Sequence, residues 1–318
     1  MTNWRTHVAK SSGLNTRRTL ARVTAAALTA ALVATGTSAA VAADAPGRSA
    51  SQAPVDVKPS GASKFGTGAE FDEYAPVNAL YGKDGNGELW GYIPNFEGGL
   101  DQDRIWSGSG WDDARFITQV DHDDDGSSDG IWDVTGSTLS YTSWGTDYQL
   151  TVGKGWNIYN RLLSAGDLGG AGADDLIARD GSGVLWLYLG YGNGKLTQRY
   201  KVGAGWNIYT HIAGQGDLTG DGKDDIVAKD SSGVLWLYKG TGNYKAPFTS
   251  RSRIGGGWNT YNNLVSVGDI DIDGITDLVA RDKTGALYLY KGTGNATAPF
   301  KSRVKIGSGG WNTYSILF

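Results

Sequence analysis

A short motif recurs five times along this chain of 318 residues. Gly-Trp followed by Asn or Asp occurs at Trp111, Trp156, Trp206, Trp258 and Trp311, at intervals of 45 to 53 residues. A second signature, Asp-x-x-Gly-x-Leu-aromatic, occurs at 84–90, 180–186, 230–236 and 282–288, and a weaker copy, DVTGSTLSY, occupies 133–141. Self-similarity at such a period indicates a repeat architecture in which each repeat is one supersecondary unit.

Each repeat has the pattern of four short strands. In residues 157–205 the segments IYNRLLSAG, DLIARD, VLWLYLG and QRYKVGAG are separated by an acidic loop and by Gly-containing turns. The turn DGSG predicts a hairpin, because Asp and Gly tolerate the backbone angles that tight turns require. Both faces of VLWLYLG are apolar, as expected for a sheet packed between two other sheets. A four-stranded unit repeated around an axis predicts an all-β fold, a β-propeller.

The two ends of the repeat region are complementary. The first repeat begins late, at VNALYGKD (77–84), which matches a second strand, and the last stops early, at GWNTYSILF (310–318), which matches a first strand. Pairing these segments would close the ring and leave no exposed sheet edge. We therefore predict five blades, with the C-terminal strand completing the first blade. The approximate repeats are 76–110 plus 311–318, 111–155, 156–205, 206–257 and 258–310.

The first 65 residues have a different composition. Residues 1–42 contain five Arg or Lys and no acidic residue, with an apolar run from 23 to 33 and Ala40-Val41-Ala42 at the end. This pattern predicts an export signal, and TRRTLAR (16–22) resembles the twin-arginine type. Residues 43–65, rich in Ala, Ser, Pro and Gly, are predicted to be a flexible leader before a domain at 66–318. We expect a secreted bacterial protein with no membrane span in the mature chain.

Composition narrows the classes of partner. Without the predicted signal the chain keeps 24 basic and 33 acidic residues, and an acidic surface repels nucleic acid. The chain has no cysteine, so disulfides cannot stabilise it. Stability must then come from burial, strand pairing or metal ions.

Four acidic loops align at the same place in successive repeats. Their side chains at positions 1, 3, 5 and 9, with Gly at position 6, are Asp121, Asp123, Asp125 and Asp129; Asp167, Gly169, Ala171 and Asp175; Asp217, Thr219, Asp221 and Asp225; Asp269, Asp271, Asp273 and Asp277. A sharp turn at Gly would direct these oxygens at one point. Hard oxygen ligands in a flexible loop suit Ca²⁺ better than Mg²⁺ or Zn²⁺. The alternative is an acidic solvated turn without metal, and we expect the 167 loop, which lacks ligands at positions 3 and 5, to be empty.

These loops, followed by DLVARD and DDIVAKD, resemble FG-GAP repeats, also called VCBS repeats, of integrin alpha chains and secreted bacterial proteins. The resemblance implies structural calcium, with a backbone carbonyl at position 7, which is Ser127, Lys223 or Ile275 here. The fivefold count and the segments IGGGWN (254–259) and IGSGGWN (306–312) also resemble tachylectin-type five-bladed lectin propellers.

Residues suited to catalysis are few. After the predicted signal only His122 and His211 remain, and we expect both to be surface residues rather than general bases. A G-x-S-x-G match at 126–130 lies inside an acidic loop and lacks the strand-to-helix context of a nucleophile elbow. We therefore predict a binding module that is not an enzyme.

The Trp motifs have two interpretations. Indole rings stack on sugars, so Trp111, Trp156, Asn157, Trp206, Asn207, Trp258, Asn259, Trp311 and Asn312 are candidate carbohydrate-binding residues. Alternatively the tryptophans wedge between blades. The first interpretation predicts a monomeric, lectin-like binder of extracellular or cell-wall glycans. The alternative function is a protein-interaction module that binds or regulates an extracellular enzyme, and an uncharacterised hydrolase ranks below both.

Overall fold

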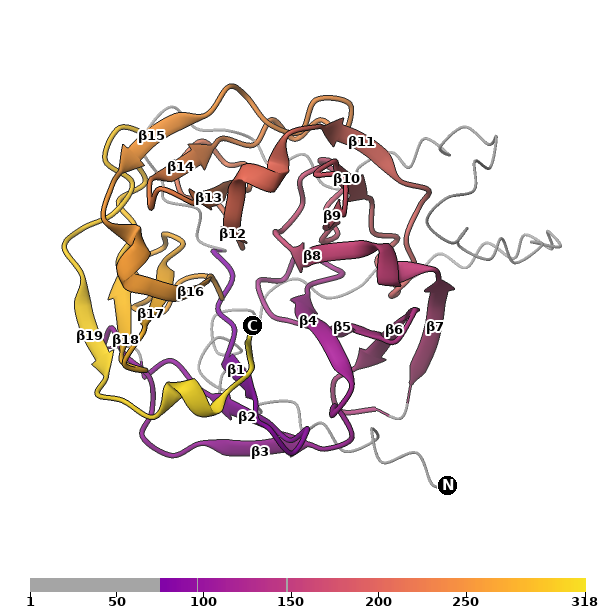
Figure 1. Cartoon of the computed structure of the whole chain (residues 1–318), viewed down its shortest axis with the longest axis horizontal. Coiled ribbons are helices and arrows are strands. Elements are labelled where there is room, and N and C mark those ends of the chain that lie inside the picture. The colour runs from indigo at the N-terminus through magenta and orange to yellow at the C-terminus, as the bar shows by residue number, and fades with distance from the viewer. Residues whose placement is uncertain (1–74, 96, 147) are drawn as a thin grey trace, which may run out of the picture.

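The computed structural model describes residues 75–95, 97–146 and 148–318, which form five four-stranded antiparallel sheets arranged in a ring (Figure 1). The predicted five-bladed propeller is confirmed. From the innermost strand outward the blades are β20 (Ile316–Leu317), β1 (Leu80–Lys83), β2 (Leu89–Tyr92) and β3 (Ile105–Gly108); β4 (Ala114–Val120), β5 (Gly130–Thr135), β6 (Thr138–Ser143) and β7 (Gln149–Lys154); β8 (Tyr159–Ser164), β9 (Leu176–Asp180), β10 (Leu185–Tyr188) and β11 (Tyr200–Gly203); β12 (Tyr209–Ala213), β13 (Ile226–Asp230), β14 (Leu235–Tyr238) and β15 (Ser252–Gly255); β16 (Tyr261–Val265), β17 (Leu278–Asp282), β18 (Leu287–Tyr290) and β19 (Val304–Gly307).

The ring closes as predicted, through β20. Strand β20 pairs antiparallel with β1, so the last segment of the chain completes the blade that contains the first strand. The Tyr314 hydroxyl lies 2.6 Å from that of Tyr92, and Arg104 donates to it at 3.0 Å. Three of the other four blades use the same contacts within continuous chain; in one of them the Tyr209 and Tyr238 hydroxyls are 2.7 Å apart. The closing strand therefore reproduces the side-chain contacts of an ordinary blade.

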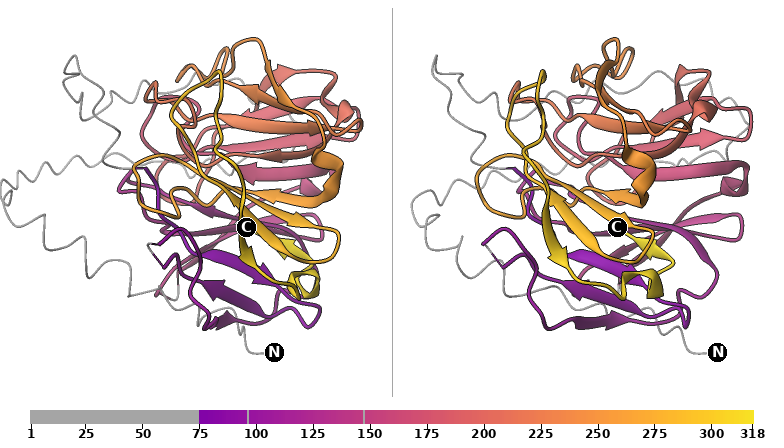
Figure 2. Two further views of the ribbon diagram at one scale, coloured as in Figure 1. Left: turned by 90° about the vertical axis from the view of Figure 1, so that its left-hand side faces the viewer. Right: turned by 60° about the vertical axis from the view of Figure 1, so that its left-hand side comes forward.

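A hydrophobic core lies between each pair of neighbouring blades. Five clusters of buried residues fill the five interfaces, and side views of the ring show the sheets stacked around its axis (Figure 2). Each cluster contains one tryptophan of the Gly-Trp motif, on a short turn that precedes an innermost strand. Four of these turns are 3-10 helices: η3 (Trp156–Ile158), η4 (Trp206–Ile208), η5 (Trp258–Thr260) and η6 (Trp311–Thr313).

Positively charged side chains link neighbouring blades. In four blades a Lys or Arg near the end of the second strand donates to backbone carbonyls at the start of the next blade. These residues are Lys83, Arg179, Lys229 and Arg281. At the remaining interface Arg115 donates to Tyr159 O at 3.0 Å. All five interfaces therefore carry a cation-to-carbonyl link.

Some sequence predictions fall on residues that the structure does not describe. The predicted export signal (1–42), the leader (43–65) and the first nine residues of the 66–318 domain lie outside the described residues. Among the described residues, no helix has the length and hydrophobicity needed to span a lipid bilayer.

Candidate metal-binding loops and surface turns

Each acidic loop connects an innermost strand to the second strand of its blade, so the four loops lie at the same end of successive blades. The predicted sharp turn is present in all of them. Gly126, Gly172, Gly222 and Gly274, at position 6, have φ between 75° and 89°, a region that favours glycine. The backbone N–H of each of these glycines donates to the position-1 aspartate at 2.6–2.8 Å.

Positions 1 and 9 serve the backbone even without a metal ion. Asp277 at position 9 accepts hydrogen bonds from Ile270 N at 3.0 Å and from Gly292 N, in the loop after β18, at 2.8 Å. Asp225 accepts the equivalent pair. The 167 loop keeps acids at positions 1 and 9 although it lacks them at 3 and 5. At position 5, Asp125 and Asp273 each accept a hydrogen bond from the backbone two residues later, so the carboxylates at position 3 are the ones that loop geometry alone does not explain.

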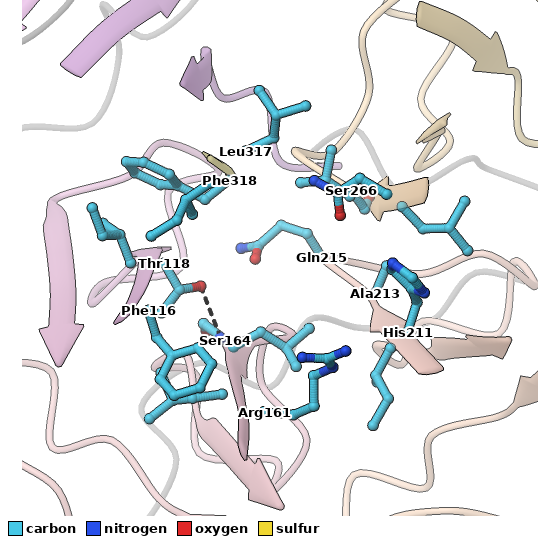
Figure 3. A pocket seen from close by; sticks show the side chains of 18 of the residues that line it. Phe116, Thr118, Arg161, Ser164, His211, Ala213, Gln215, Ser266, Leu317 and Phe318 are labelled. Atoms are coloured by element: carbon cyan, nitrogen blue, oxygen red, sulfur yellow. Dashed lines mark hydrogen bonds between the residues drawn. The ribbon is translucent and has the colours of Figure 1, made fainter. Parts of the chain in front are cut away.

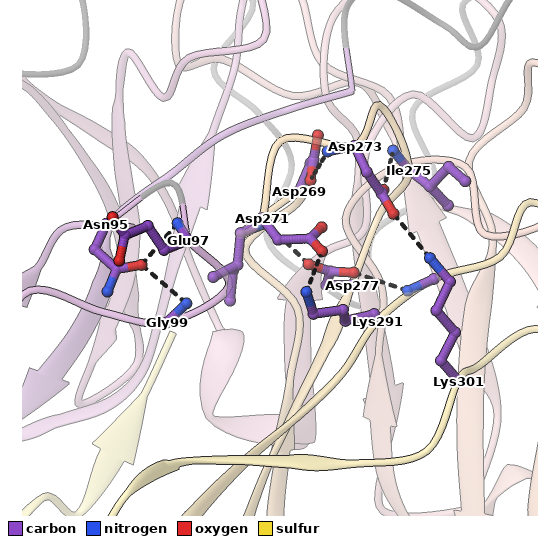
Figure 4. A network of polar contacts seen from close by, with 12 residues as sticks. Asn95, Glu97, Gly99, Asp269, Asp271, Asp273, Ile275, Asp277, Lys291 and Lys301 are labelled. Atoms are coloured by element: carbon purple, nitrogen blue, oxygen red, sulfur yellow. Dashed lines mark hydrogen bonds and ion pairs between the residues drawn. The ribbon is translucent and has the colours of Figure 1, made fainter.

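The 269 loop brings three carboxylates together (Figure 4). Ligand oxygens of Asp269, Asp271 and Asp273 all lie within 4.8 Å of one another. The Asp271 side chain is only 9% exposed, and its Oδ1 is buried with no hydrogen-bond partner among the described residues. Lys291 contacts the other oxygen of Asp271 at 2.7 Å, and Lys301 lies 3.1 Å from Asp273. A buried carboxylate oxygen without a donor fits a site for a cation.

The 121 loop also gathers carboxylates. Oxygens of Asp121, Asp123 and Asp129 lie within 4.8 Å of one another, and Asp121 is buried. Asp125, the fourth predicted ligand, accepts a hydrogen bond from Ser127 N at 2.9 Å and is not part of that group. The residues present in both loops fit a divalent cation bound by oxygen.

The other two acidic loops, at 217 and 167, differ from the 269 and 121 loops. In the 217 loop Asp217, Asp221 and Asp225 do not form such a group among the described residues. Lys239 lies 2.8 Å from Asp221, and the Thr219 hydroxyl is directed to Asp217 at 3.4 Å. The 167 loop likewise forms no such group within the described part of the chain. The structure thus favours two of the three loops for which the sequence predicted calcium, and calcium at each remains a prediction.

Burial of the aspartate side chains in these loops disfavours their ionised form. Desolvation raises the pKa of Asp121 to about 8 and that of Asp269 to about 6. Desolvation also raises the pKa of Asp225 and of Asp277 to about 7. A divalent cation at the loop would reverse this shift because it favours the ionised carboxylates.

The residue at position 8, which the sequence analysis did not single out, connects loops of neighbouring blades. Asp174 Oδ2 accepts hydrogen bonds from Asp121 N at 3.0 Å and from Gln215 Nε2 at 3.1 Å. Asp224 Oδ2 accepts one from Asp167 N at 2.5 Å. The Asp-Asp doublets at 174–175 and 224–225 were the signal in the sequence. The first aspartate of each doublet accepts a hydrogen bond from an adjacent blade, whereas the second accepts hydrogen bonds within its own blade.

The candidate carbohydrate residues divide into buried and exposed groups. All five motif tryptophans are buried, at 0–8% exposure, and Trp156, Trp206 and Trp258 each lie 4.6 Å, ring centre to ring centre, from a tyrosine of the same blade. Sugar stacking on these indole faces is not available, which corrects that interpretation and leaves the wedge between blades. The neighbouring Asn157, Asn207, Asn259 and Asn312 are exposed.

Neither predicted surface histidine is fully exposed. The His122 ring packs 4.9 Å from Tyr141 and 5.9 Å from Trp132, and desolvation lowers its pKa to about 4. His211 lies in the ring's interior, where Nε2 donates to Asn262 O at 2.8 Å, and desolvation together with Lys229 lowers its pKa to about 4. Both side chains are half-buried, so the expectation of surface residues holds only in part: His122 packs on rings of its own blade, and His211 contacts the next blade.

Family comparison agrees with the loop pattern. A profile described as FG-GAP-like repeat matches residues 167–228 and 217–280. These segments are FG-GAP-like repeats. Each FG-GAP-like segment begins at an acidic loop and ends in the second strand of the following blade, β13 or β17. No curated protein matches the sequence.

Solved structures with similar folds include two lectins. The BP39L lectin from Burkholderia pseudomallei is 11% identical, with a TM-score of 0.42 over 73% of this chain and 70% of that one. A lectin from Agrocybe aegerita, described as recognising non-reducing terminal N-acetylglucosamine, is 19% identical, with a TM-score of 0.41 over 71% and 64% of the two chains. The Photorhabdus luminescens Tc holotoxin pore is 14% identical, with a TM-score of 0.36 over 67% of this chain and 11% of that one. Likeness at this level concerns the fold alone.

Proposed function

We propose that this chain is a secreted, calcium-stabilised β-propeller that binds extracellular carbohydrate through surface turns repeated around the ring. The observation that carries the proposal is the equivalence of the turns η3 to η6. In each, a left-handed Gly with φ of 85–90° precedes a buried Trp and an exposed Asn. The fifth turn has Asp112 in place of Asn.

The exposed side chains of these turns suit a sugar. Asn207 is followed by Ile208, which is 46% exposed, and Asn157 by Ile158, which is 40% exposed. A polar amide beside an apolar side chain offers hydrogen bonds to hydroxyl groups and contact with the C–H face of a ring. In η5 and η6 the Asn is followed by a threonine instead, and four turns with an exposed Asn on one ring would bind a repetitive polymer with an avidity that exceeds the affinity of any single turn.

A glycan array, probed with the chain in calcium and again in chelator, tests this proposal. We expect binding to extracellular or cell-wall glycans, weakened about tenfold or more when Asn207 and Asn259 are both replaced by Ala, because fewer sites then contribute avidity. Asn193→Ala, an exposed Asn in the loop after β10, is the matched control and should bind like the parent chain. An array without any bound glycan would contradict the proposal.

An extracellular protein is the second candidate ligand. Ile105 and Trp106, adjacent on the outermost strand β3, are 39% and 44% exposed, and exposed apolar residues of this kind occur at protein interfaces. A silent glycan array combined with a partner recovered from culture medium, and lost on Trp106→Ala, would favour this candidate.

A further inference from the structure

The axis of the ring encloses a cavity of about 310 Å³, lined by the innermost strands of all five blades (Figure 3). Its charged lining residues are three arginines, Arg115, Arg161 and Arg281. In the part of the chain that the structure describes, no Asp or Glu lines this cavity. This distribution is unexpected for a chain with more acidic than basic residues.

The arginines gather with His211 at one end of the cavity, where the innermost strands begin. Arg161 Nη2 donates to Thr210 O at 2.7 Å, and His211 Nε2 donates to Asn262 O at 2.8 Å. Each of these two side chains therefore donates to a backbone carbonyl of the next blade. Figure 3 shows Arg161 beside His211. Arg281 Nε donates to Asn262 Oδ1 at 2.9 Å.

No described carboxylate compensates this charge. The described ion pairs all lie at the acidic loops, and none includes Arg115, Arg161 or Arg281. The charged neighbours that act on His211 are Lys229, Arg161 and Arg281, all of which lower its pKa. Ile316 pairs with Lys83 as Arg161 pairs with Arg179, so Ile316 and Arg161 occupy equivalent positions in their blades. A terminal carboxylate on Phe318 would lie two residues further along the innermost strand, towards the other end of the cavity.

Linking the blades does not require these charges. A neutral amide could donate to the same carbonyls, and neither Arg161 nor Arg281 has a carboxylate partner among the described ion pairs, so their positive charge is available to an anionic ligand. Arg281 uses Nε and Nη1 for Asn262, Trp311 and Tyr314, while its Nη2 has no described partner. A guanidinium with free N–H groups is suited to bidentate hydrogen bonding of an oxyanion.

We infer that the arginine end of the axial cavity, lined by Arg115, Arg161 and Arg281, is a binding site for a small oxyanion, a carboxylate, phosphate or sulfate group, with Nη2 of Arg281 as a donor. The cavity volume is at the lower end of the range for ligand sites, which limits the ligand to a small molecule or to an acidic end group. The acidic loops lie at the other ends of the innermost strands, so this site is separate from the proposed metal sites. It lies at the same end of the ring as the surface turns proposed to bind carbohydrate, and Arg281 contacts one of them, η6, through Trp311 O at 2.8 Å.

Isothermal titration with sodium sulfate, inorganic phosphate and sodium acetate, at constant ionic strength in a chloride buffer, tests the inference. We expect saturable binding with a Kd below about 1 mM for at least one probe, and the ranking of the three shows which oxyanion geometry fits best. Arg161→Gln should weaken binding by about tenfold or more, because a positive charge is lost from the cavity lining.

A second variant covers the case in which Arg161→Gln fails to fold. Asn263 lines the cavity and is paired in register with Arg281, so Asn263→Asp places a carboxylate next to that guanidinium. We expect this variant to be at least as stable as the parent chain and to lose oxyanion binding. Asn193→Asp, with the same change of charge on an outer loop, should bind normally. Absence of saturable binding in the parent chain, or binding unchanged in Asn263→Asp, would overturn the inference.

Discussion

At the scale of single residues, the hairpin signature has a physical explanation. In the three copies of Asp-x-x-Gly-x-Leu-aromatic that end in Trp, the aspartate accepts backbone N–H groups of its own turn and the indole N–H of the tryptophan. Asp180 Oδ2, for example, accepts from Trp186 Nε1 at 2.9 Å, and Asp230 from Trp236 at the same distance. The carboxylate thus fixes the turn and the tryptophan together, which is why the two residue types recur at one spacing.

A single glycine tests ring closure at this scale. A Cβ atom added to Gly82 on β1 would lie 2.5–2.8 Å from ring atoms of Tyr314, next to the closing strand. We expect Gly82→Ala to lower the free energy of unfolding by about 1–3 kcal/mol, because the tyrosine must shift. Chemical denaturation measures the change. Gly85→Ala, where no atom lies within 4 Å, is the matched control and should change stability little. Equal stability of the two variants would contradict the closing contact.

The interior histidine predicts a dependence on pH. Because the pKa of His211 is lowered to about 4, the unfolded chain takes up a proton near pH 6.5 while the folded chain does not. The folded state therefore loses stability as pH falls from about 6.5 towards 4. We expect His211→Asn to show a smaller decrease in melting temperature between pH 7 and pH 5 than the parent chain, in chloride buffer. Identical decreases would show that His211 is protonated equally in both states.

At the scale of elements, the acidic loop is a backbone structure to which metal ligands are added. The 167 and 269 loops have the same turn glycine and the same acids at positions 1 and 9, yet only the 269 loop gathers three carboxylates among the described residues. Lysines from the following strands and loops contribute as well. Lys291 and Lys301 both approach the 269 loop, so their charge opposes a cation there.

The lysine contact predicts a gain of function. Removing the ammonium group 2.7 Å from Asp271 should strengthen binding of Ca²⁺, because a positive charge no longer repels the cation. We expect Lys291→Met to increase calcium affinity severalfold in isothermal titration. Lys305→Met, which removes an exposed lysine on β19, should leave affinity unchanged. A weaker affinity in Lys291→Met would show that the lysine supports the site.

The fold could be predicted from the sequence more fully than the contacts between blades and the candidate site. The two motifs that recur five times predicted five blades, and the complementary chain ends predicted closure through the terminal strand, because both signals can be recognised along the chain without knowledge of distant contacts. The hydrogen bonds from Lys and Arg side chains to the next blade were not predicted, because they join residues far apart in the sequence. Lys229 Nζ, for example, donates to Tyr261 O, 32 residues away. The 217 loop has Thr219 where the 269 loop has Asp271, so it lacks the third carboxylate that the 269 loop gathers. The burial of Trp156 follows from packing between blades, which the motif alone left open.

At the scale of the whole molecule, the chain stabilises a ring without disulfides. Five interblade cores and five cation links act around the circle, and buried aspartates join neighbouring loops. In this account calcium adds to the same framework: at a concentration tenfold above its Kd, each ion contributes about 1.4 kcal/mol to folding. Two such ions would contribute about 3 kcal/mol.

Thermal unfolding in excess calcium and in excess chelator is the most direct test of this account. We predict a melting temperature higher by about 6–12 °C in calcium, the shift expected for about 3 kcal/mol in a domain of this size. Asp123→Asn combined with Asp271→Asn should abolish this difference while leaving the melting temperature in chelator nearly unchanged, because neither side chain supports its loop through a described hydrogen bond to the backbone. A melting temperature of the parent chain that is the same in calcium and in chelator would contradict the account.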